Sequence, residues 1–551
     1  MQPILEQLAG LRGNGLDIVA AYLDDVVVAG DSAAVLEAFR LLCTAAPGVG
    51  LHLRFDKCEL IPTCCPGTSA NLAAFPDAVQ RLRDGNFELL GAPIGDRAFC
   101  EAYTRRKRVD KANVRLNSLG DLCESHAEYK ILSSCLGALH AMRTTRPDYI
   151  RGALSDFDTA VVHALGSTLG EALPGAAQAQ AQLSSSAGGL GLRSALEHAE
   201  CAFLASAVGT FSLCQDLDPQ FIWGDAAVRE AATAFNAKVA PSDQLDFTAM
   251  PDDLHAFSQS SLSDKVESRA AAALAALASS ESKARLQAAA APHAGAWLQA
   301  PATQALGLRL SCAEFRAAAK YRLGCNFLAE DKWCPKCDQP LQRNAGHGPR
   351  CNGGGDITVR HNGLRDDCFF RCLGAGLDCE REVSGLLPSD PRRRPGDLVL
   401  RNCPGMGAVA LDFAVTCPMQ PAWQQDAGQR PLAAAMGYEA HKFADRETAQ
   451  RCNIAGYRLI PMVAETLGGW GPEAQSFFRV LSKATAEHKG LDLSLASNQL
   501  YQALGIRLQR ANARAILSRV AAAPLDQTAL AATSRSEAVL VGSRVGPLHA
   551  A

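Results

Sequence analysis

Hydrophobic residues occur in short blocks along the chain, and their spacing changes from strand-like to helix-like. Two apolar runs, residues 18–22 and 26–29, flank an acidic pair and predict two β-strands joined by a tight turn. Leucines at helical spacing predict a mainly helical region over residues 112–240, and the alanine-dominated stretch 265–300 predicts a helical connector. The pattern further predicts strands over residues 398–400 and 410–415 and a helix over residues 433–452.

The acidic pair Asp24 and Asp25 follows Tyr22 and Leu23 directly and lies between the first two predicted strands. Burying an unpaired carboxylate is costly, so the pair is expected at the turn, facing water or a divalent cation. Aspartate tolerates turn geometry, and carboxylate oxygens are ligands that Mg²⁺ prefers. A solvated Asp-Asp turn is the alternative interpretation.

Length and composition indicate several domains and no membrane segment. The 551 residues give room for about three or four domains. Hydrophobic residues make up 48% of the chain, but no apolar run reaches the ~18 residues that a membrane helix needs. The N-terminus lacks the features of a secretory signal, so a nuclear or cytoplasmic location without a membrane partner is expected. In such a reducing compartment, the 20 cysteines favour metal binding over disulfides.

Basic residues gather in local patches, although the formal net charge of −3 gives no global reason to bind nucleic acid. Clustered cations neutralise phosphates and release counterions, which makes binding insensitive to sequence and strongly dependent on salt. A solvated basic turn is the alternative for each patch. The predicted nucleic-acid-binding residues are Lys57, Arg105, Arg106, Lys107, Arg108, Arg392, Arg393 and Arg394.

Three cysteines and a histidine have the spacing of a zinc site. Cys334 and Cys337 are separated by two residues, and His347 and Cys351 by three. Thiolate and imidazole are preferred zinc ligands, and four protein ligands fill a tetrahedral site. The spacing therefore predicts a structural Zn²⁺ in a small knuckle, with four unrelated residues of a cysteine-rich chain as the alternative.

Two further aspartates fall beside the later predicted strands. Asp397 precedes the first of these strands and Asp412 lies within the second, so both can converge on one Mg²⁺ or Mn²⁺ that polarises a phosphodiester. Lys442, on the predicted helix, can reach the site and stabilise developing negative charge. Glu382 is a weaker metal-ligand candidate. The alternative is that the aspartates mark strand ends and Lys442 is an exposed helix lysine.

The N-terminal part resembles reverse transcriptases of non-LTR retrotransposons. Residues 22–25 are similar to the catalytic Tyr-x-Asp-Asp box, residues 50–60 to the Gly-Leu-x-Leu and Lys-Cys-Glu segment that follows it, and residues 87–95 to the primer-grip hairpin. The resemblance implies a palm with Asp24 and Asp25 as catalytic metal ligands. Such a palm needs a third carboxylate on an upstream strand, which residues 1–21 do not supply. The polymerase part is therefore expected to be inactive by itself.

The later part resembles the restriction-like endonuclease of site-specific non-LTR retrotransposons, a relative of the Pro-Asp…Asp/Glu-x-Lys nucleases. The resemblance rests on a knuckle that precedes the core and on residues 360–366, 394–397, 411–412 and 465–471. It implies that Asp397, Asp412 and Lys442 are catalytic.

The chain departs from the nuclease pattern at three positions. Gly396 separates the proline from the first aspartate, and Ala414 stands where these nucleases place lysine, so Lys442 is expected to take that role. Phe443 stands where an aromatic residue, often tyrosine, is expected beside that lysine.

Pattern and resemblance together predict a multi-domain α+β protein. Its function is expected to be that of a retrotransposon fragment that contacts DNA and RNA and nicks DNA with a divalent metal. A catalytically dead nucleic-acid-binding relic is the alternative. The predicted segments are a truncated palm (1–100), a helical thumb (101–200), a helical connector (201–331), the zinc knuckle (332–356), an α/β nuclease (357–490) and a tail of unknown role (491–551).

Overall fold

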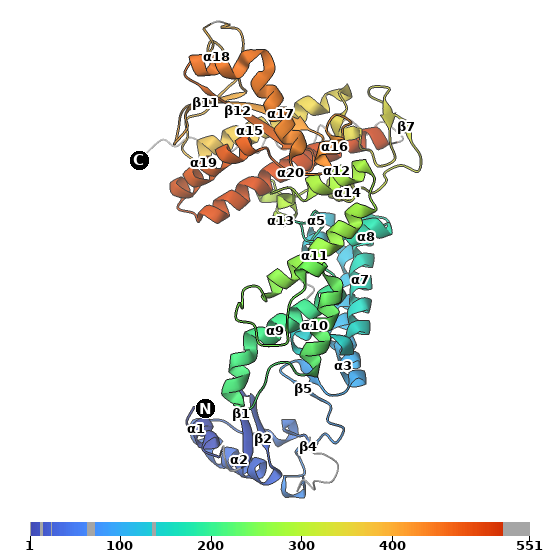
Figure 1. The fold of residues 1–551 in the computed structure, drawn as a ribbon, viewed down its shortest axis with the longest axis vertical. Helices are drawn as coiled ribbons and strands as arrows, with labels where there is room; N and C mark the ends of the chain where they lie inside the picture. The colour runs from blue at the N-terminus through green and yellow to red at the C-terminus, as the bar shows by residue number, and fades with distance from the viewer. Residues whose placement is uncertain are drawn as a thin grey trace. The chain divides into compact units, whose positions relative to one another are not determined.

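The computed structural model describes residues 2–11, 15–23, 25–62, 72–134, 139–388 and 390–521. It is a mixed α+β structure that is mainly helical and contains small sheets (Figure 1). The chain forms two compact units. Unit 1 comprises Met1–Leu116, Leu136–Ala160 and Ser194–Arg269, and unit 2 comprises Asn117–Cys135, Val161–Arg193 and Ala270–Ala551.

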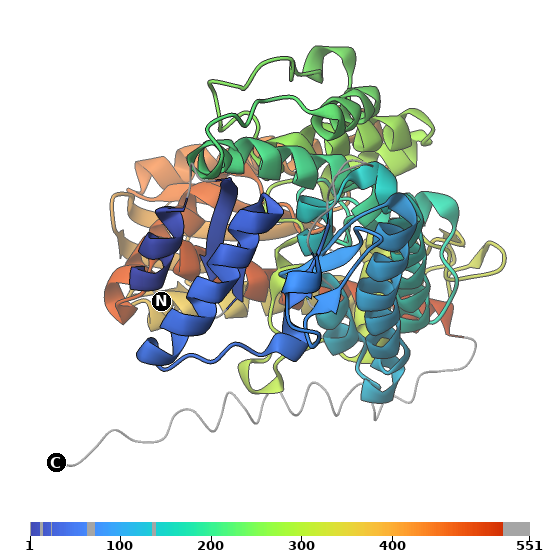
Figure 2. The ribbon, with the colours of Figure 1, turned by 90° about the horizontal axis from the view of Figure 1, so that it is seen from below.

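Unit 1 begins with a β-hairpin that two helices cover. Strands β1 (Leu16–Tyr22) and β2 (Asp25–Gly30) pair antiparallel, which confirms both predicted strands. Helices α1 (Gln2–Ala9) and α2 (Ser32–Ala45) pack against the hairpin through a shared apolar cluster (Figure 2). The hairpin tip is left open to solvent, because Tyr22 and Leu23 are 62% and 79% exposed.

The remainder of unit 1 contains short strands followed by helices. Strands β5 and β6 form an antiparallel hairpin within residues 87–95, where the sequence predicted one. The elements are β3 (Glu59–Leu60), β4 (Gln80–Arg81), β5 (Phe87–Leu89), β6 (Ala92–Ile94), α3 (Arg97–Thr104), a π-helical turn (Arg105–Val109), α4 (Asp110–Asn117), α6 (Leu139–Thr144), α9 (Ala195–Leu217) and α10 (Ala226–Lys238). Helices α7 (Arg151–Leu169) and α11 (Gln259–Ala276) run from unit 1 into unit 2.

One helical segment is long and apolar enough to cross a membrane by length and composition alone. It spans Ser32–Val49, which is α2 and the turn after it. Helix α2 also buries Ala34, Ala38 and Leu42 against the hairpin, as a core helix of a globular unit does. The segment therefore carries no conclusion about a membrane.

Unit 2 is built around a four-stranded sheet of order β12-β11-β10-β9. Strand β11 (Gly407–Thr416) pairs parallel with β12 (Arg458–Glu465) and antiparallel with β10 (Leu398–Cys403), and β9 (Glu380–Arg381) forms the other edge. Both strands predicted near residues 398 and 410 are confirmed, and each is longer than predicted.

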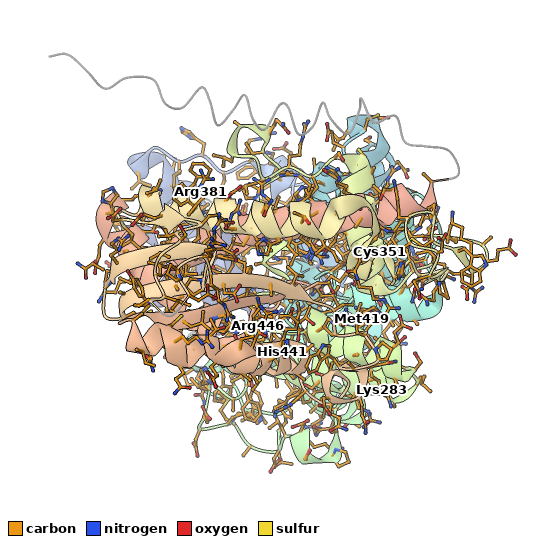
Figure 3. The ribbon with its side chains drawn as sticks, turned by 90° about the horizontal axis from the view of Figure 1, so that it is seen from above. Lys283, Cys351, Arg381, Met419, His441 and Arg446 are labelled. Atoms are coloured by element: carbon orange, nitrogen blue, oxygen red, sulfur yellow. The ribbon has the colours of Figure 1, made fainter. Side chains whose placement is uncertain are left out.

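Helices cover both faces of this sheet, and alternate residues of each strand point to opposite faces. One face packs on α15 (Asp356–Gly374), α19 (Pro472–Lys489) and α20 (Leu493–Val520). Helices α17 (Ala433–Ala444) and α18 (Thr448–Ile454) cover the other face, and the strands lie between these two layers in Figure 3. The remaining elements are α5 (Ser125–Ser134), α8 (Gly175–Ala181), α12 (Ser280–Ala289), α13 (Ala296–Gln299), α14 (Cys312–Leu323), β7 (Lys332–Trp333), β8 (Pro340–Leu341) and α16 (Gln424–Ala427).

The single helix predicted over residues 433–452 is wrong, because the chain forms two helices there. Arg446 and Glu447 have φ values of 46° and 55°, which break the helical hydrogen-bond pattern between α17 and α18. The Arg393 guanidinium donates to the Thr448 hydroxyl, and this hydroxyl donates to the Asp445 carbonyl at 2.6 Å. These tertiary contacts fix the break at a point where the sequence contains neither glycine nor proline.

Candidate functional site

The hairpin tip of unit 1 carries the first predicted acidic site. Asp25 is the first residue of β2, is exposed, and pairs in register with Tyr22. Asp24 lies outside the described residues. Lys57, from the segment that follows, is exposed on a short 3₁₀ turn.

The basic cluster at residues 105–108 is partly neutralised within unit 1. The Arg105 guanidinium lies 2.7 Å from the Asp156 carboxylate, and the Lys107 ammonium lies 3.3 Å from Glu88. Arg108 donates to the Gly91 carbonyl at 3.3 Å. The Arg106 guanidinium lies over the Tyr103 ring. This cluster therefore presents less free positive charge than its sequence indicates.

The second basic patch, residues 392–394, also contains arginines that contact other side chains of the protein. Arg392 is exposed, whereas Arg394 lies 2.8 Å from the Glu382 carboxylate and Arg393 contacts Thr448. Glu382 also lies 2.5 Å from Arg365. The Glu382 carboxylate, a weaker metal-ligand candidate in the sequence, is therefore paired with the guanidiniums of Arg365 and Arg394.

Asp397 and Asp412 lie close together at the start of the β10–β11 hairpin. Asp397 immediately precedes β10, and its backbone amide donates to the Leu411 carbonyl at 2.8 Å. Its Oδ2 accepts a hydrogen bond of 2.7 Å from the Phe413 amide, directly after Asp412. Gly396 allows this close approach, because a Cβ there would lie 2.8 Å from the Leu411 carbonyl oxygen. Close packing against Leu411 therefore explains the glycine at position 396, where the chain departs from the nuclease pattern.

A cationic side chain accompanies each of these two aspartates. The Lys442 ammonium on α17 lies 2.8 Å from Oδ2 of Asp412, and the His361 imidazole on α15 lies 3.2 Å from Oδ2 of Asp397. All four side chains are partly buried, with exposed fractions between 17% and 29%. The structure therefore brings together the three predicted residues and one histidine from the opposite helical layer.

The surroundings shift the pKa values of these groups in different directions. Burial raises the pKa of Asp412 above its ordinary value, and Lys442 offsets only part of this effect, while nearby Asp397 adds to it. Burial also disfavours the charge on Asp397, but His361 and the Phe413 amide outweigh it, so its pKa is lowered. The same contact raises the pKa of His361. Two carboxylates thus lie in one partly buried site, and each is paired with a basic side chain.

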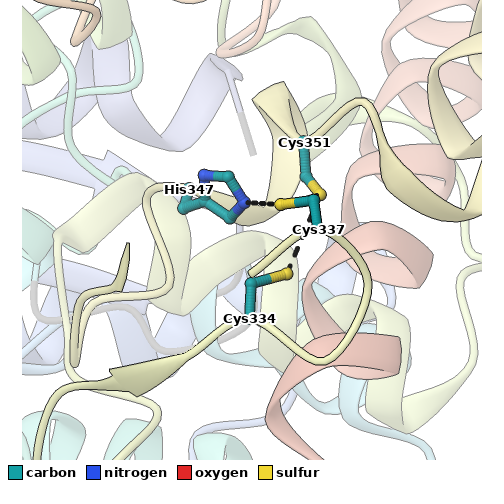
Figure 4. Close-up of side chains that lie close together, drawn as sticks. All are labelled: Cys334, Cys337, His347 and Cys351. Carbon is teal, nitrogen blue, oxygen red and sulfur yellow. Dashed lines mark hydrogen bonds between the residues drawn. The ribbon is translucent and has the colours of Figure 1, made fainter. Parts of the chain in front are cut away.

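Cys334, Cys337, His347 and Cys351 converge in unit 2 (Figure 4). Their ligand atoms all lie within 4.8 Å of one another, with Cys334 and Cys351 Sγ atoms 3.8 Å apart and Cys337 Sγ 3.0 Å from His347 Nε2. A tetrahedral zinc site with bonds of about 2.3 Å needs ligand separations of this size. Among the described residues, this is the only group of three or more His, Cys, Asp or Glu side chains arranged to hold one metal ion.

Local backbone structure brings the four ligands together. Cys334 follows β7, and the turn to β8 returns the chain so that the Cys334 amide donates to the Gln339 carbonyl at 2.8 Å. His347 and Cys351 flank one 3₁₀ turn, which keeps them close enough in space for both side chains to reach the two other cysteines. Cys334 and Cys351 are each 1% exposed, so the cluster is enclosed and all four positions are protein ligands.

Buried arginines join the knuckle to the helical layer of the sheet. The Arg519 guanidinium of α20 donates to Asp356 at 2.7 Å and to the Gly353 carbonyl at 2.5 Å. Arg360 of α15 donates to the Pro349 carbonyl at 2.7 Å. In Figure 3, Cys351 and Arg381 lie toward opposite ends of α15, so the knuckle and the β9 edge are separate regions of unit 2. The segment predicted as a tail of unknown role thus supplies a helix that anchors the zinc cluster.

Glu465 is a fully buried acid that the sequence showed only as part of a motif. It ends β12, and its Oε1 accepts a hydrogen bond of 3.1 Å from the Ala435 amide in the first turn of α17. Burial raises its pKa to about 7, and its Oε2 has no hydrogen-bond partner among the described residues. This acid positions the start of the helix that carries Lys442.

Glu465→Gln is expected to stabilise the protein more at pH 8 than at pH 5. The folded state holds the Glu465 proton up to pH about 7, whereas an unfolded chain releases it near pH 4–5, so stability falls as pH rises through this window. Glutamine removes this penalty and keeps an acceptor for Ala435, for a gain of about 1–3 kcal/mol at pH 8. Calorimetry at both pH values measures the effect, with exposed Glu487→Gln as control. If Glu465→Gln changed the free energy of unfolding by the same amount at pH 5 and at pH 8, the raised pKa of Glu465 would be contradicted.

Comparison with protein-family models and with curated protein sequences gives no match for this chain. Function is therefore inferred from the residues of the sites. The sequence showed His361 only as part of the motif at residues 360–366 and gave it no role, because no spacing signal connects it with Asp397.

Proposed function

We propose that the chain is a retrotransposon-derived reverse transcriptase and endonuclease fragment whose α/β unit nicks DNA with a divalent metal. The observation that carries the proposal is the cluster of Asp397, Asp412, Lys442 and His361 at the start of one β-hairpin. Two carboxylates with a lysine at the end of two paired strands are suited to phosphodiester cleavage.

The two aspartates are suited to hold Mg²⁺ or Mn²⁺. Their donor atoms are hard oxygens, and the charge of Asp397 raises the pKa of Asp412, so a cation between them would relieve repulsion. Mg²⁺ is commonly bound by one or two carboxylates together with substrate phosphate, so a third protein carboxylate is not required. When bound, the ion would supply positive charge to the scissile phosphate and favour ionisation of a water.

The other two side chains have complementary roles in this proposal. The Lys442 ammonium favours the ionised form of Asp412 and can turn toward the charge that develops on the phosphate. The hydrogen bond to Asp397 raises the pKa of His361, which favours the protonated imidazole and suits this side chain to proton transfer. Arg392 and Lys57 are exposed cations that can contact phosphates.

The cysteine and histidine cluster is proposed to hold one structural Zn²⁺. All four positions are filled by protein atoms, so no position is left for substrate, and the ion would stabilise residues 332–356 and their contact with α20.

A nicking assay on the full chain tests the nuclease proposal. Supercoiled plasmid is incubated with the protein and Mg²⁺, Mn²⁺ or Ca²⁺ at low salt, and relaxed and linear products are quantified. The proposal requires nicking with Mg²⁺ or Mn²⁺ and none with chelator.

The second candidate is a binding protein without nuclease activity, and the closed Asp412–Lys442 ion pair favours it. Retention of plasmid in a gel without any nicking would support this candidate.

The polymerase-like part is expected not to extend a primer. Asp25 begins β2 at the open tip of the hairpin, whereas Asp17, the carboxylate of β1, lies about 17 Å from Tyr22 along the strand at ~3.4 Å per residue. Asp17 therefore cannot share a metal with Asp25, and two-metal nucleotidyl transfer needs ligands from more than one strand. Residues 1–551 are incubated with an RNA template, a DNA primer, nucleotides and Mg²⁺. Extension that disappears in Asp25→Ala would contradict this expectation.

A further inference from the structure

A cavity of about 600 Å³ lies in unit 2, lined by residues that belong neither to the carboxylate site nor to the zinc cluster. Its walls come from the turn at residues 185–186, the segment 290–299 and one face of α20. None of the lining residues is an acid, a lysine or an arginine. Besides His293, the polar side chains of the lining carry hydroxyl or amide groups and belong to Ser185, Ser186, Gln299, Asn498, Tyr501 and Gln502. The volume is in the range of sites for small organic ligands.

Two stacked rings form one wall of this cavity. The rings of His293 and Tyr501 are 3.6 Å apart with an interplanar angle of 3°. Tyr501 is buried and held by edge contact with Phe478, whereas His293 is exposed on its other side. The outer face of the imidazole is therefore a flat surface on which another planar ring can stack.

The backbone at His293 is strained. Its φ of 64° is in the left-handed region, which costs a residue other than glycine about 1 kcal/mol or more. A strained backbone conformation persists only where the surrounding structure fixes it. Such residues are common at ligand-binding sites. Here the strained conformation places the imidazole on Tyr501 at the cavity wall.

A buried positive charge lies next to residues that line the cavity. The Arg322 guanidinium is 1% exposed and donates to the carbonyls of Ser185 and Ala289 at 2.8 and 2.9 Å, and to those of Gly189 and Ala294 at 3.0 and 3.3 Å. Among the described residues no carboxylate pairs with Arg322, and the Arg285 guanidinium donates to the Arg322 backbone carbonyl. Burial lowers the pKa of both arginines to about 10, so both remain charged at neutral pH. Carbonyl groups compensate such charge only in part, and an anion in the cavity would be attracted.

We propose that this cavity binds a nucleotide, with the base stacked on His293 and the phosphate held by the positive potential of Arg322 and Arg285. The amides of Asn498 and Gln502 offer both donors and acceptors, which match the edge of a base. The nucleotide can be free or can be the end of a single strand, since both present the same base and phosphate. This inference does not depend on the proposed nuclease.

Binding of AMP to the full chain tests this proposal. The buffer contains a chelator, so that no divalent metal can bind AMP at the carboxylate site. Calorimetry compares AMP with adenosine, inorganic phosphate and a 5′-phosphorylated oligo-dA. The key variant is His293→Asn, because asparagine tolerates the left-handed backbone and removes the ring. His163→Ala, an exposed histidine on α7, is the matched control.

The proposal predicts saturable AMP binding that is weaker for adenosine and undetectable for phosphate alone. Loss of base stacking in His293→Asn should weaken AMP binding about tenfold, while His163→Ala leaves it unchanged. Tighter binding of the oligonucleotide than of AMP identifies a strand end as the ligand, and the reverse identifies a free nucleotide. Absence of AMP binding, or equal affinity in the wild type and His293→Asn, overturns the proposal. Neither result affects the nicking assay.

Discussion

Asp412→Asn is expected to reduce metal-dependent nicking by about 10³-fold, or about 4 kcal/mol of transition-state stabilisation. Asparagine has nearly the volume of aspartate and leaves the β10–β11 hairpin intact, since the backbone pairing of Asp412 is with Pro461 of β12. It lacks the charge that attracts a divalent cation, and it leaves the Lys442 ammonium without its 2.8 Å partner. The change therefore acts on chemistry more than on folding.

The initial rate of plasmid relaxation measures this loss. Asp426→Asn, an exposed aspartate on α16 in the same unit, is the matched control and should nick at the wild-type rate. Lys442→Arg keeps the charge and should lose less activity than Lys442→Met. Unchanged nicking in Asp412→Asn would show that the activity resides elsewhere.

The local strand signals of the sequence were sufficient to predict the two hairpins that carry aspartates. Residues 18–29 contain alternating apolar runs around Asp24 and Asp25, and the structure forms β1 and β2 there. The strands around Asp397 and Asp412 follow equally from apolar runs broken by one charge. The four zinc-ligand positions follow from spacing, because a Cys-x2-Cys turn and a His-x3-Cys turn are local structures.

Contacts between distant segments could not be predicted in this way. His361 reaches Asp397 only because α15 packs beside the hairpin, and no periodicity connects the two residues. The long helix α20 carries no motif, yet its buried Arg519 anchors the knuckle, and its Tyr501 forms a cavity wall. The break after α17 likewise depends on a tertiary contact from Arg393. Such features arise from packing, which single-sequence patterns do not encode.

The basic cluster at residues 105–108 shows a further limit of sequence reasoning. Four consecutive cations predict a phosphate-binding surface, but carboxylates from other elements can neutralise them after folding. Asp156 and Glu88 do so here for Arg105 and Lys107. Net local charge, and therefore binding to nucleic acid, depends on neighbours that are remote in sequence.

Removal of zinc is expected to unfold residues 332–356 and to loosen α20 from the knuckle. Four ligand atoms within 4.8 Å of one another, two of them thiols that are 1% exposed, cannot be stabilised by the short β7–β8 pair alone. Structural zinc contributes on the order of 10 kcal/mol at such sites. Loss of the knuckle would also deprive the buried Arg519 of its Gly353 acceptor, so the effect should spread to the end of α20.

Cys337→Ser tests this expectation with little disturbance of packing, because Cys337 is the most exposed of the four ligands. Serine is a weak zinc ligand, so the variant should retain well below one zinc per chain, and a protease should cleave within residues 332–356. Cys214→Ser, a partly buried cysteine on α9, is the matched control and should keep one zinc and resist cleavage. Zinc is counted by mass spectrometry after gel filtration, and cleavage sites are mapped by peptide mass. Since thiolates bind the ion only when deprotonated, wild-type protein should also release zinc as pH falls below about 5. Full zinc content in Cys337→Ser, or no zinc in wild-type protein prepared with zinc in the buffers, would show that the cluster is not a metal site.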